Sequence, residues 1–220
     1  MSEQDAISLL HMLPNTVSTL EADFITSGVQ SGMTLIVHSS LSSLGWVCGG
    51  AVSVILSLEE VLSPEGTLVM PAHSVVRSSH PQLSFAAWGK HNEYIVTDDH
   101  YDYALNAQSP LGRIYELNGF ILLLGVGHDN NTSLHLAEHL ADYPAKKRIR
   151  NGMPVRDKDG TRWKEFDDIE ISPDDFEEIG AAYEQEHEIR SGKVGNADCK
   201  LINQKSLVDF AVTWMETHRM

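Results

Sequence analysis

Residues 125–139, GVGHDNNTSLHLAEH, hold the side chains of this sequence that are best suited to chemistry. Glu138 and His139 follow His135 by three and four residues, so a helix would place all three on one face. Asp129 lies in the segment before that helix. A histidine can accept a proton near neutral pH, and a neighbouring carboxylate fixes its tautomer and stabilises the imidazolium. His135 is therefore a possible general base, with Glu138 or Asp129 as its carboxylate partner.

Two other interpretations of this stretch stay open on the residues alone. The string from His135 to His139 matches HxxEH, the inverted zinc-peptidase pattern, which would need a third ligand from another element. In the second interpretation, Asn131 or Thr132 only caps a helix and the histidines face solvent. Asn130 and the free N–H groups of that helix start could also donate to a developing oxyanion.

A second segment, HSSLSSLGWVCGGA at 38–51, combines hydroxyl side chains with glycines before an expected helix. Free N–H groups at a helix start and the helix dipole favour an anion, and Gly49 and Gly50 let a ligand approach the backbone closely. The segment is not GxxxxGK[ST], and the sequence lacks GxGxxG and GxSxG, which argues against a nucleoside triphosphatase, a dinucleotide site and a serine hydrolase. A site for a phosphate-bearing cofactor and an ordinary connection are the two interpretations left.

The expected elements would bring these segments together. Apolar runs at 33–40, 67–73 and 119–127 are typical of buried strands, and 51–62 and 132–141 have helical spacing. This alternation predicts an α/β/α layered fold with a central, mostly parallel or mixed sheet. Ligands bind beyond the carboxyl ends of such strands, where polar residues follow each run, so the three polar clusters are expected to converge.

Other patterns predict the remaining helices and one hairpin. Two short helices are expected over 2–29, with Asn15 as a cap, and an amphipathic helix over 204–218. The Asp159-Gly160 pair predicts a small hairpin. An acidic helix is expected to begin with Ser172 as its cap and Pro173 in its first turn.

The charge balance excludes some partners and favours others. The formal net charge is −15, and 157–188 contains 13 acidic against three basic side chains. Such a surface repels nucleic acid and attracts polycations, although a solvated acidic helix is the simpler explanation. The length of 220 residues fits a single catalytic domain over 1–220, with an acidic substrate-side subregion at about 150–190.

The cellular compartment is inferred from the absence of membrane, secretion and disulfide signals in the sequence. No apolar run approaches the roughly 20 residues of a membrane helix, and the first residues do not read as a signal peptide. Cys48 and Cys199 are far apart and form no CxxC pair, so we expect a protein of the reducing cytoplasm without a disulfide framework. The oligomeric state stays open between monomer and homodimer.

Several long segments resemble the aminoglycoside 3-N-acetyltransferase family. They are LIVHSSLSSLGWVCGG (35–50), MPAHS (70–74), RSSHPQLSFAAWGKH (77–91), SPLGRIYELNGFILLLGVGHDNNTSLHLAEH (109–139) and EIRSGKVGNADCKLINQKSLVDFAVTWM (188–215). The resemblance implies an α/β/α enzyme, distinct from the common N-acetyltransferase fold. It would use acetyl-CoA to acetylate the 3-amino group of the 2-deoxystreptamine ring of an aminoglycoside antibiotic and so confer resistance.

The resemblance also implies roles for particular residues. His135 would be the general base, with Asp129 and Glu138 orienting or charging it, and no metal is expected. Coenzyme A would lie along the turn after the first strand, close to Ser39, Ser40, Leu41 and Ser42. From their positions and chemistry, we add His38, Arg77 and Ser109 as further candidates for contact with coenzyme A, and His73, Asn130 and Asp157 as candidates for contact with the aminoglycoside. A structural hydrogen bond, cap or ion pair is the alternative at each of the scattered positions.

One departure from the family pattern affects the expected cleft. The family has a long Pro- and Trp-containing segment after MPAHS, whereas here Ser74 runs directly into Val75. A natural shortening, an engineered deletion and a loop omitted from the numbering are the three explanations. Either of the first two would leave open a relative that binds coenzyme A or aminoglycoside without catalysis.

Overall fold

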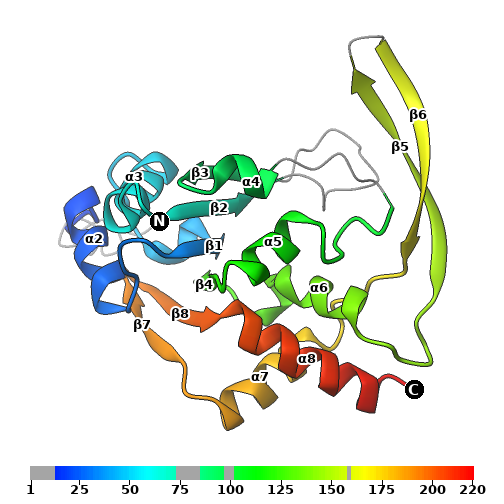
Figure 1. The fold of residues 1–220 in the computed structure, drawn as a ribbon. Helices are drawn as coiled ribbons and strands as arrows, with labels where there is room; N and C mark the ends of the chain where they lie inside the picture. Colours follow the sequence, from blue (N-terminus) through cyan, green and yellow to red (C-terminus); the bar gives the residue numbers. More distant parts are fainter. Residues whose placement is uncertain (1–12, 73–84, 97–101, 158–159) are drawn as a thin grey trace, which may run out of the picture.

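The computed structural model describes residues 13–72, 85–96, 102–157 and 160–220, with only the backbone for 153 and 155–157. Its centre is a six-stranded sheet in the order β3-β2-β1-β4-β8-β7 (Figure 1). The three strands expected from apolar runs are β1 (Thr34–Ser39), β2 (Thr67–Pro71) and β4 (Phe120–Leu124). β1 lies between β2 and β4 and is parallel to both.

The middle residues of these central strands are apolar because both faces of the sheet are covered. Ile36 and Ile121 point into one core, whereas Leu35 and Leu122 point into the other. All four side chains are fully buried. The period-two alternation of a strand therefore splits one apolar run between two separate cores.

Helices cover both faces of the sheet and complete the α/β/α layers. The core that contains Leu35 is closed by α2 (Val17–Thr26) and α3 (Ala51–Leu62). The core that contains Ile36 is closed by the helices α4 (Asn92–Val96), α5 (Pro110–Glu116), α6 (Ser133–Leu140), α7 (Phe176–Glu186) and α8 (Gln204–His218). The layered fold with a mixed sheet is thus confirmed.

The outer strands make the sheet mixed. β3 (Phe85–Gly89) pairs antiparallel with β2, and β8 (Ala197–Asn203) pairs antiparallel with β4. β7 (Arg190–Val194) joins β8 by a hairpin at the edge of the sheet. These strands carry alternating or small residues instead of continuous apolar runs, which is why periodicity did not single them out.

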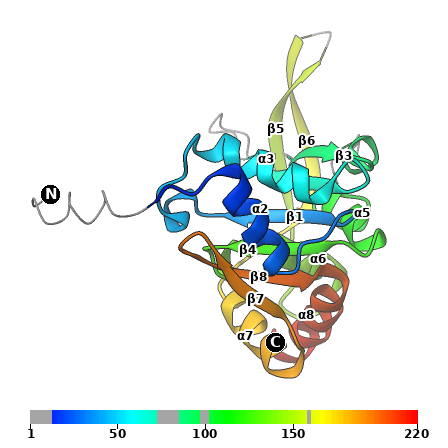
Figure 2. The ribbon, with the colours of Figure 1, turned by 90° about the vertical axis from the view of Figure 1, so that its left-hand side faces the viewer.

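The predicted hairpin around Asp159-Gly160 exists and is much longer than expected. β5 (Arg148–Asp157) and β6 (Gly160–Ile169) pair antiparallel along their whole length. Figures 1 and 2 show this ribbon rising away from the body of the molecule. Among its described side chains, the buried ones are Phe166, Asp168 and Ile169, at its base.

Two predicted helix starts were wrong. α2 is capped by Thr16, whose side chain accepts a hydrogen bond from the Thr19 N–H, while the Asn15 amide donates to the Leu44 carbonyl. α7 has Asp175 as its N-cap residue, so Ser172 and Pro173 precede the helix. In the described part of the chain, no helix has the length and apolar character needed to cross a membrane.

Candidate active site

The carboxyl ends of β1, β2 and β4 meet at one edge of the sheet, as the strand pattern predicted. They border a cavity of about 180 Å³. Its lining comes from β1 (Val37, His38, Ser39), from β2 (Met70, Pro71) and from the segment after β4 (Val126, Asn130). His73 and Arg77 lie outside the described residues.

The turn after β1 exposes its polar groups. Ser39, Leu41 and Ser42 are exposed, and Ser40 is partly buried. The turn is a short 3-10 helix, η1 (Leu41–Leu44), held by the Ser40 N–H, which donates to the Leu124 carbonyl at 3.0 Å. The Ser40 and Ser42 hydroxyls are 3.1 Å apart. This arrangement fixes the backbone of the turn while leaving hydroxyl groups available to a ligand.

The start of α3 also has the conformation that the glycines allow. Gly49 and Gly50 have φ values of 86° and 60°, a region that residues with a Cβ avoid. Ala51 and Val52 at the helix start are exposed. The start of α3 therefore lies at the surface, where an anion site at a helix terminus would have to be.

His135 lies on α6 in contact with Glu138. Its Nδ1 is 2.5 Å from Glu138 Oε2, and its side chain is 14% exposed. The ring packs at 59° against Phe176, with 4.8 Å between centroids. A carboxylate accepts only, so Nδ1 carries the proton and donates it to this bond. Nε2 is then the basic nitrogen, and no described residue bonds to it.

Glu138 is fully buried, and three groups donate hydrogen bonds to it. Beside His135, these are the Ser172 N–H at 2.9 Å and Arg219 Nη1 at 2.7 Å, both to Oε1. A buried carboxylate needs such donors because its desolvation is otherwise costly. The sequence singled out Glu138, but it gave no sign that Ser172 and Arg219 contact it, since these contacts depend on the packing of distant segments.

Asp129 occupies a different environment from Glu138. It is exposed, and its Oδ1 accepts from the Asn130 side-chain amide at 2.7 Å. The structure gives it no bond to His135. Of the two carboxylates that the sequence offered as partners, only Glu138 contacts the imidazole.

The start of α6 links the dyad to the strand ends. Thr132 Oγ1 is 3.4 Å from His38 Nε2, and His38 is buried at the end of β1. Asn131 is fully buried, and its side-chain oxygen accepts from the Ser133 N–H. His135 follows one turn later, so α6 begins at the edge of the sheet where the cavity lies.

The zinc interpretation does not fit the third member of HxxEH. His139 Nδ1 donates to the His135 carbonyl at 2.9 Å, and His139 Nε2 is 3.0 Å from Asp168 Oδ1. Both ring nitrogens therefore face oxygen acceptors and neither is available to a metal. Among the residues that the structure describes, no group of three or more His, Cys, Asp or Glu side chains is arranged to hold a metal.

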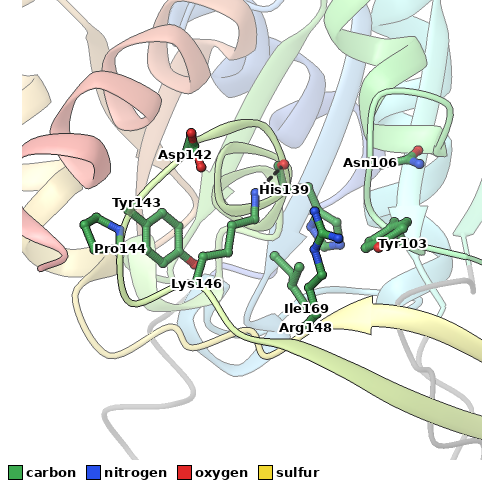
Figure 3. Close-up of a pocket in the computed structure, with 9 residues that line it drawn as sticks. All are labelled: Tyr103, Asn106, His139, Asp142, Tyr143, Pro144, Lys146, Arg148 and Ile169. Carbon is green, nitrogen blue, oxygen red and sulfur yellow. Dashed lines mark hydrogen bonds between the residues drawn. The ribbon is translucent and has the colours of Figure 1, made fainter.

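A larger cavity of about 700 Å³ lies at the other end of α6 (Figure 3). Lys146 donates to the carbonyls of His139 and Ala141 and so closes the helix end. Burial and the nearby Arg148 lower the pKa of Lys146. The full lining is Tyr103, Asn106, His139, Asp142, Tyr143, Pro144, Lys146, Arg148 and Ile169.

Two predicted site residues lie apart from these groups. Ser109 is fully buried and caps α5, where its hydroxyl accepts from the Gly112 N–H at 3.3 Å. We therefore leave it out of the site. Asp157 ends β5 at the far end of the hairpin, where the structure describes only its backbone.

The sequence also missed a buried histidine outside the dyad. His128 is 1% exposed, and its Nε2 is 2.9 Å from Glu184 Oε1, which also contacts Lys200 at 2.6 Å. Although burial acts to raise it, these hydrogen bonds lower the pKa of Glu184 below its usual value. The ring lies against Gly180, where a Cβ would come within 2.1 Å of it. His128 thus joins α7 to the sheet and takes no part in the dyad.

Comparison with known proteins points to one family. The family model described as aminoglycoside 3-N-acetyltransferase matches residues 36–75 and 73–216. The two matches meet at the position where the sequence indicated a missing segment. The SPbeta prophage-derived aminoglycoside N(3')-acetyltransferase-like protein YokD of Bacillus subtilis (strain 168) is 36% identical over 253 residues, covering 91% of this chain and 92% of the relative. That alignment is longer than the 220 residues of this chain, so YokD carries residues without a counterpart here.

Solved structures show the same likeness. The crystal structure of YokD has a TM-score of 0.88 at 34% identity, covering 94% of this chain and 96% of that one. AAC-IIIb in a binary complex with CoASH has a TM-score of 0.85 at 25% identity, covering 93% and 97%. A histidine-to-alanine variant of aminoglycoside acetyltransferase AAC(3)-IVa, in complex with a gentamicin, has a TM-score of 0.83 at 28% identity, covering 94% and 91%. With this fold, a relative 36% identical to it and a family match that spans most of its length, the chain belongs to the aminoglycoside 3-N-acetyltransferase family.

Proposed function

We propose that this protein acetylates the 3-amino group of the 2-deoxystreptamine ring of an aminoglycoside, with acetyl-CoA as donor and His135 as general base. The supporting observation is the His135–Glu138 pair, whose 2.5 Å bond leaves Nε2 as the basic nitrogen. The relatives support the two substrates, since AAC-IIIb was solved with CoASH and AAC(3)-IVa with a gentamicin.

The reaction needs a correctly oriented base and hydrogen-bond donors for an oxyanion. An ammonium has no lone pair, so the acceptor amine must lose a proton before or during attack on the thioester carbonyl. His135 Nε2 takes this proton as the C–N bond forms, and Glu138 stabilises the resulting imidazolium. The C–S bond then breaks, and the thiolate of coenzyme A takes a second proton from the attacking nitrogen, which leaves a neutral amide. Exposed hydroxyls and N–H groups at the strand ends would donate to the oxyanion.

The turn after β1 and the start of α3 suit the donor substrate. Coenzyme A is an anion, and the protein also has a negative net charge of −15. The phosphates of coenzyme A therefore need hydrogen-bond donors close by. We assign this role to the exposed turn Ser39–Ser42 and to the N–H groups that follow Gly50. His38 and Asn130 border the cavity between this turn and α6. Since acetyl-CoA is a metabolite of the cytoplasm, we propose that compartment as the place of action.

A thiol-release assay with acetyl-CoA and a panel of aminoglycosides tests the function. Wild-type protein should release free thiol only when an accepted amine is present. His135→Ala should lower turnover by at least about 100-fold, the usual contribution of a general base. His187→Ala is the matched control, because His187 stacks on Tyr183 at the far end of α7 and should leave turnover near the wild-type value.

Two results would contradict the proposal in different ways. Turnover of His135→Ala near the wild-type rate would refute His135 as the base while keeping the reaction. Binding of coenzyme A in a calorimeter, with no thiol released in the presence of any amine, would instead identify a non-catalytic relative. Loss of the segment after Ser74 would then explain the lack of activity.

A further inference from the structure

A chain of buried polar contacts runs from His135 to a residue with no place in the sequence motifs. Glu138 bonds His135 through Oε2 at 2.5 Å and Arg219 through Oε1 at 2.7 Å. Glu138 is fully buried and the Arg219 side chain is 14% exposed. Three helices, α6, α7 and α8, supply or adjoin the groups of this chain, so its geometry depends on how they pack.

Arg219 is held by more contacts than an ordinary surface cation. Its Nε is 2.7 Å from Asp175 Oδ2, and its Nη2 is 2.5 Å from Asp175 Oδ1. Nη2 also donates to the Ser172 carbonyl at 3.2 Å, and the guanidinium lies 5.2 Å from the centre of the Tyr143 ring. A planar guanidinium can satisfy two carboxylates at once in this way, whereas an ammonium cannot.

We infer, on the basis of the proposed function, that Arg219 is a positioning residue that keeps the Glu138 carboxyl group aimed at His135 Nδ1. With Oε1 bound to Arg219 and to the Ser172 N–H, Oε2 is the oxygen left to face the imidazole. This arrangement selects the tautomer with a free Nε2. Asp175 in turn holds Arg219, so the acidic start of α7 serves the dyad indirectly.

The electrostatic surroundings are consistent with this role. Although burial opposes it, hydrogen bonds to Asp175 and Glu138 raise the pKa of Arg219 above its usual value. Other charged or titratable groups around Glu138 include Tyr143, Lys146, Asp175, Glu170, Asp174 and His218. Arg219 bonds the Glu138 carboxylate directly, so its removal leaves Glu138 buried with one fewer charged partner.

The first test measures the pH profile of three variants. In Arg219→Gln, kcat should fall by about 10-fold or more while KM for both substrates changes by less than about twofold, because no substrate contact is lost. The acidic limb of the kcat/KM profile should move, because Arg219 sets both the charge and the hydrogen bonding around the His135–Glu138 pair. Arg219→Lys should recover part of the rate. Arg150→Gln, which removes an exposed arginine of the hairpin, is the control and should leave both quantities unchanged.

Chemical rescue separates positioning from general damage to the fold. Arg219 borders a cavity of about 740 Å³, so Arg219→Ala leaves an accessible space. Added guanidinium at millimolar concentration should raise the turnover of Arg219→Ala several-fold. Methylammonium at the same concentration should raise it much less. An unaltered pH profile in Arg219→Gln would overturn the inference, as would the absence of selective rescue.

A readout without turnover keeps this inference separable from the proposed function. Nitrogen NMR of the histidine rings should show His135 with its proton on Nδ1 in the wild-type protein and mixed tautomers in Arg219→Gln. The same measurement applies even when no aminoglycoside is a substrate. A pure Nδ1–H tautomer that persists in Arg219→Gln would refute the positioning role whatever the activity assays show.

Discussion

His135 and Glu138 are three residues apart on one helix, yet their environments differ in the way a base and its orienting group require. His135 keeps a partly exposed ring, whereas Glu138 is fully buried among donors. A histidine that remains reachable can exchange protons with a substrate, and a buried carboxylate can hold only one orientation. The different roles of the two residues, base and orienting carboxylate, thus come from burial as much as from residue type.

The two cysteines should differ in reactivity for the same reason. Cys48 is exposed beside the start of α3, whereas burial raises the pKa of the Cys199 thiol to about 11. Since the thiolate is the reactive form, native protein should consume one equivalent of Ellman's reagent per chain and unfolded protein two. Cys48→Ala should abolish the native reaction and retain turnover. A second thiol reacting at the native rate, or loss of turnover in Cys48→Ala, would contradict this assignment.

At the scale of elements, α7 is joined to the sheet by a buried polar contact. Glu184 on α7 lies between His128, in the segment after β4, and Lys200 on β8. The start of the same helix supplies Phe176 and Asp175 to the surroundings of the dyad. The placement of α7 therefore affects both the stability of the fold and the geometry of the base.

The lowered pKa of Glu184 predicts how this contact depends on pH. A carboxylate with a depressed pKa contributes stability above its unfolded-state pKa and loses that contribution as pH falls through the folded-state value. Glu184→Gln should lower the free energy of unfolding at pH 7 by about 1–2 kcal/mol. Its loss of stability between about pH 5 and pH 3 should be smaller than that of the wild-type protein. Urea unfolding at both ends of this range measures the difference, and parallel pH curves would rule out the assigned role.

At the scale of the whole molecule, charge favours one of the two proposed substrates. The net charge of −15 attracts a polycationic aminoglycoside and opposes coenzyme A. The acidic residues of 157–188 contribute much of this charge, and several line the cavity beside Arg219, namely Glu170, Asp174 and Asp175. Binding of the two substrates should therefore respond differently to salt.

Raising the ionic strength from about 0.05 M to about 0.5 M should lower kcat/KM for the aminoglycoside at least about threefold, because screening shortens the range of attraction. Over the same range kcat/KM for acetyl-CoA should stay level or rise. Steady-state kinetics with each substrate varied in turn measures both. An equal response of the two substrates would show that the overall charge does not steer the acceptor.

The sequence by itself determined the layers of the fold and the half of the site that lies on one helix. Continuous apolar runs predict β1, β2 and β4 because buried parallel strands need apolar residues on both faces. The spacing of His135 and Glu138 predicts their contact because a helix repeats every 3.6 residues. Local chemistry also predicted the glycine turn before α3 and the hairpin near Gly160.

Only the tertiary structure decided which distant groups complete the site. The choice of Glu138 over Asp129, the removal of His139 from a metal site by Asp168, and the contact of Arg219 with Glu138 all depend on segments brought together by packing. Spacing along the chain constrains neighbours within a few residues, whereas contacts between α6, α7 and α8 follow from the shape of the shared core. The antiparallel strands β3, β7 and β8 were missed for a related reason, since edge position and pairing partner leave only a weak trace in a single sequence.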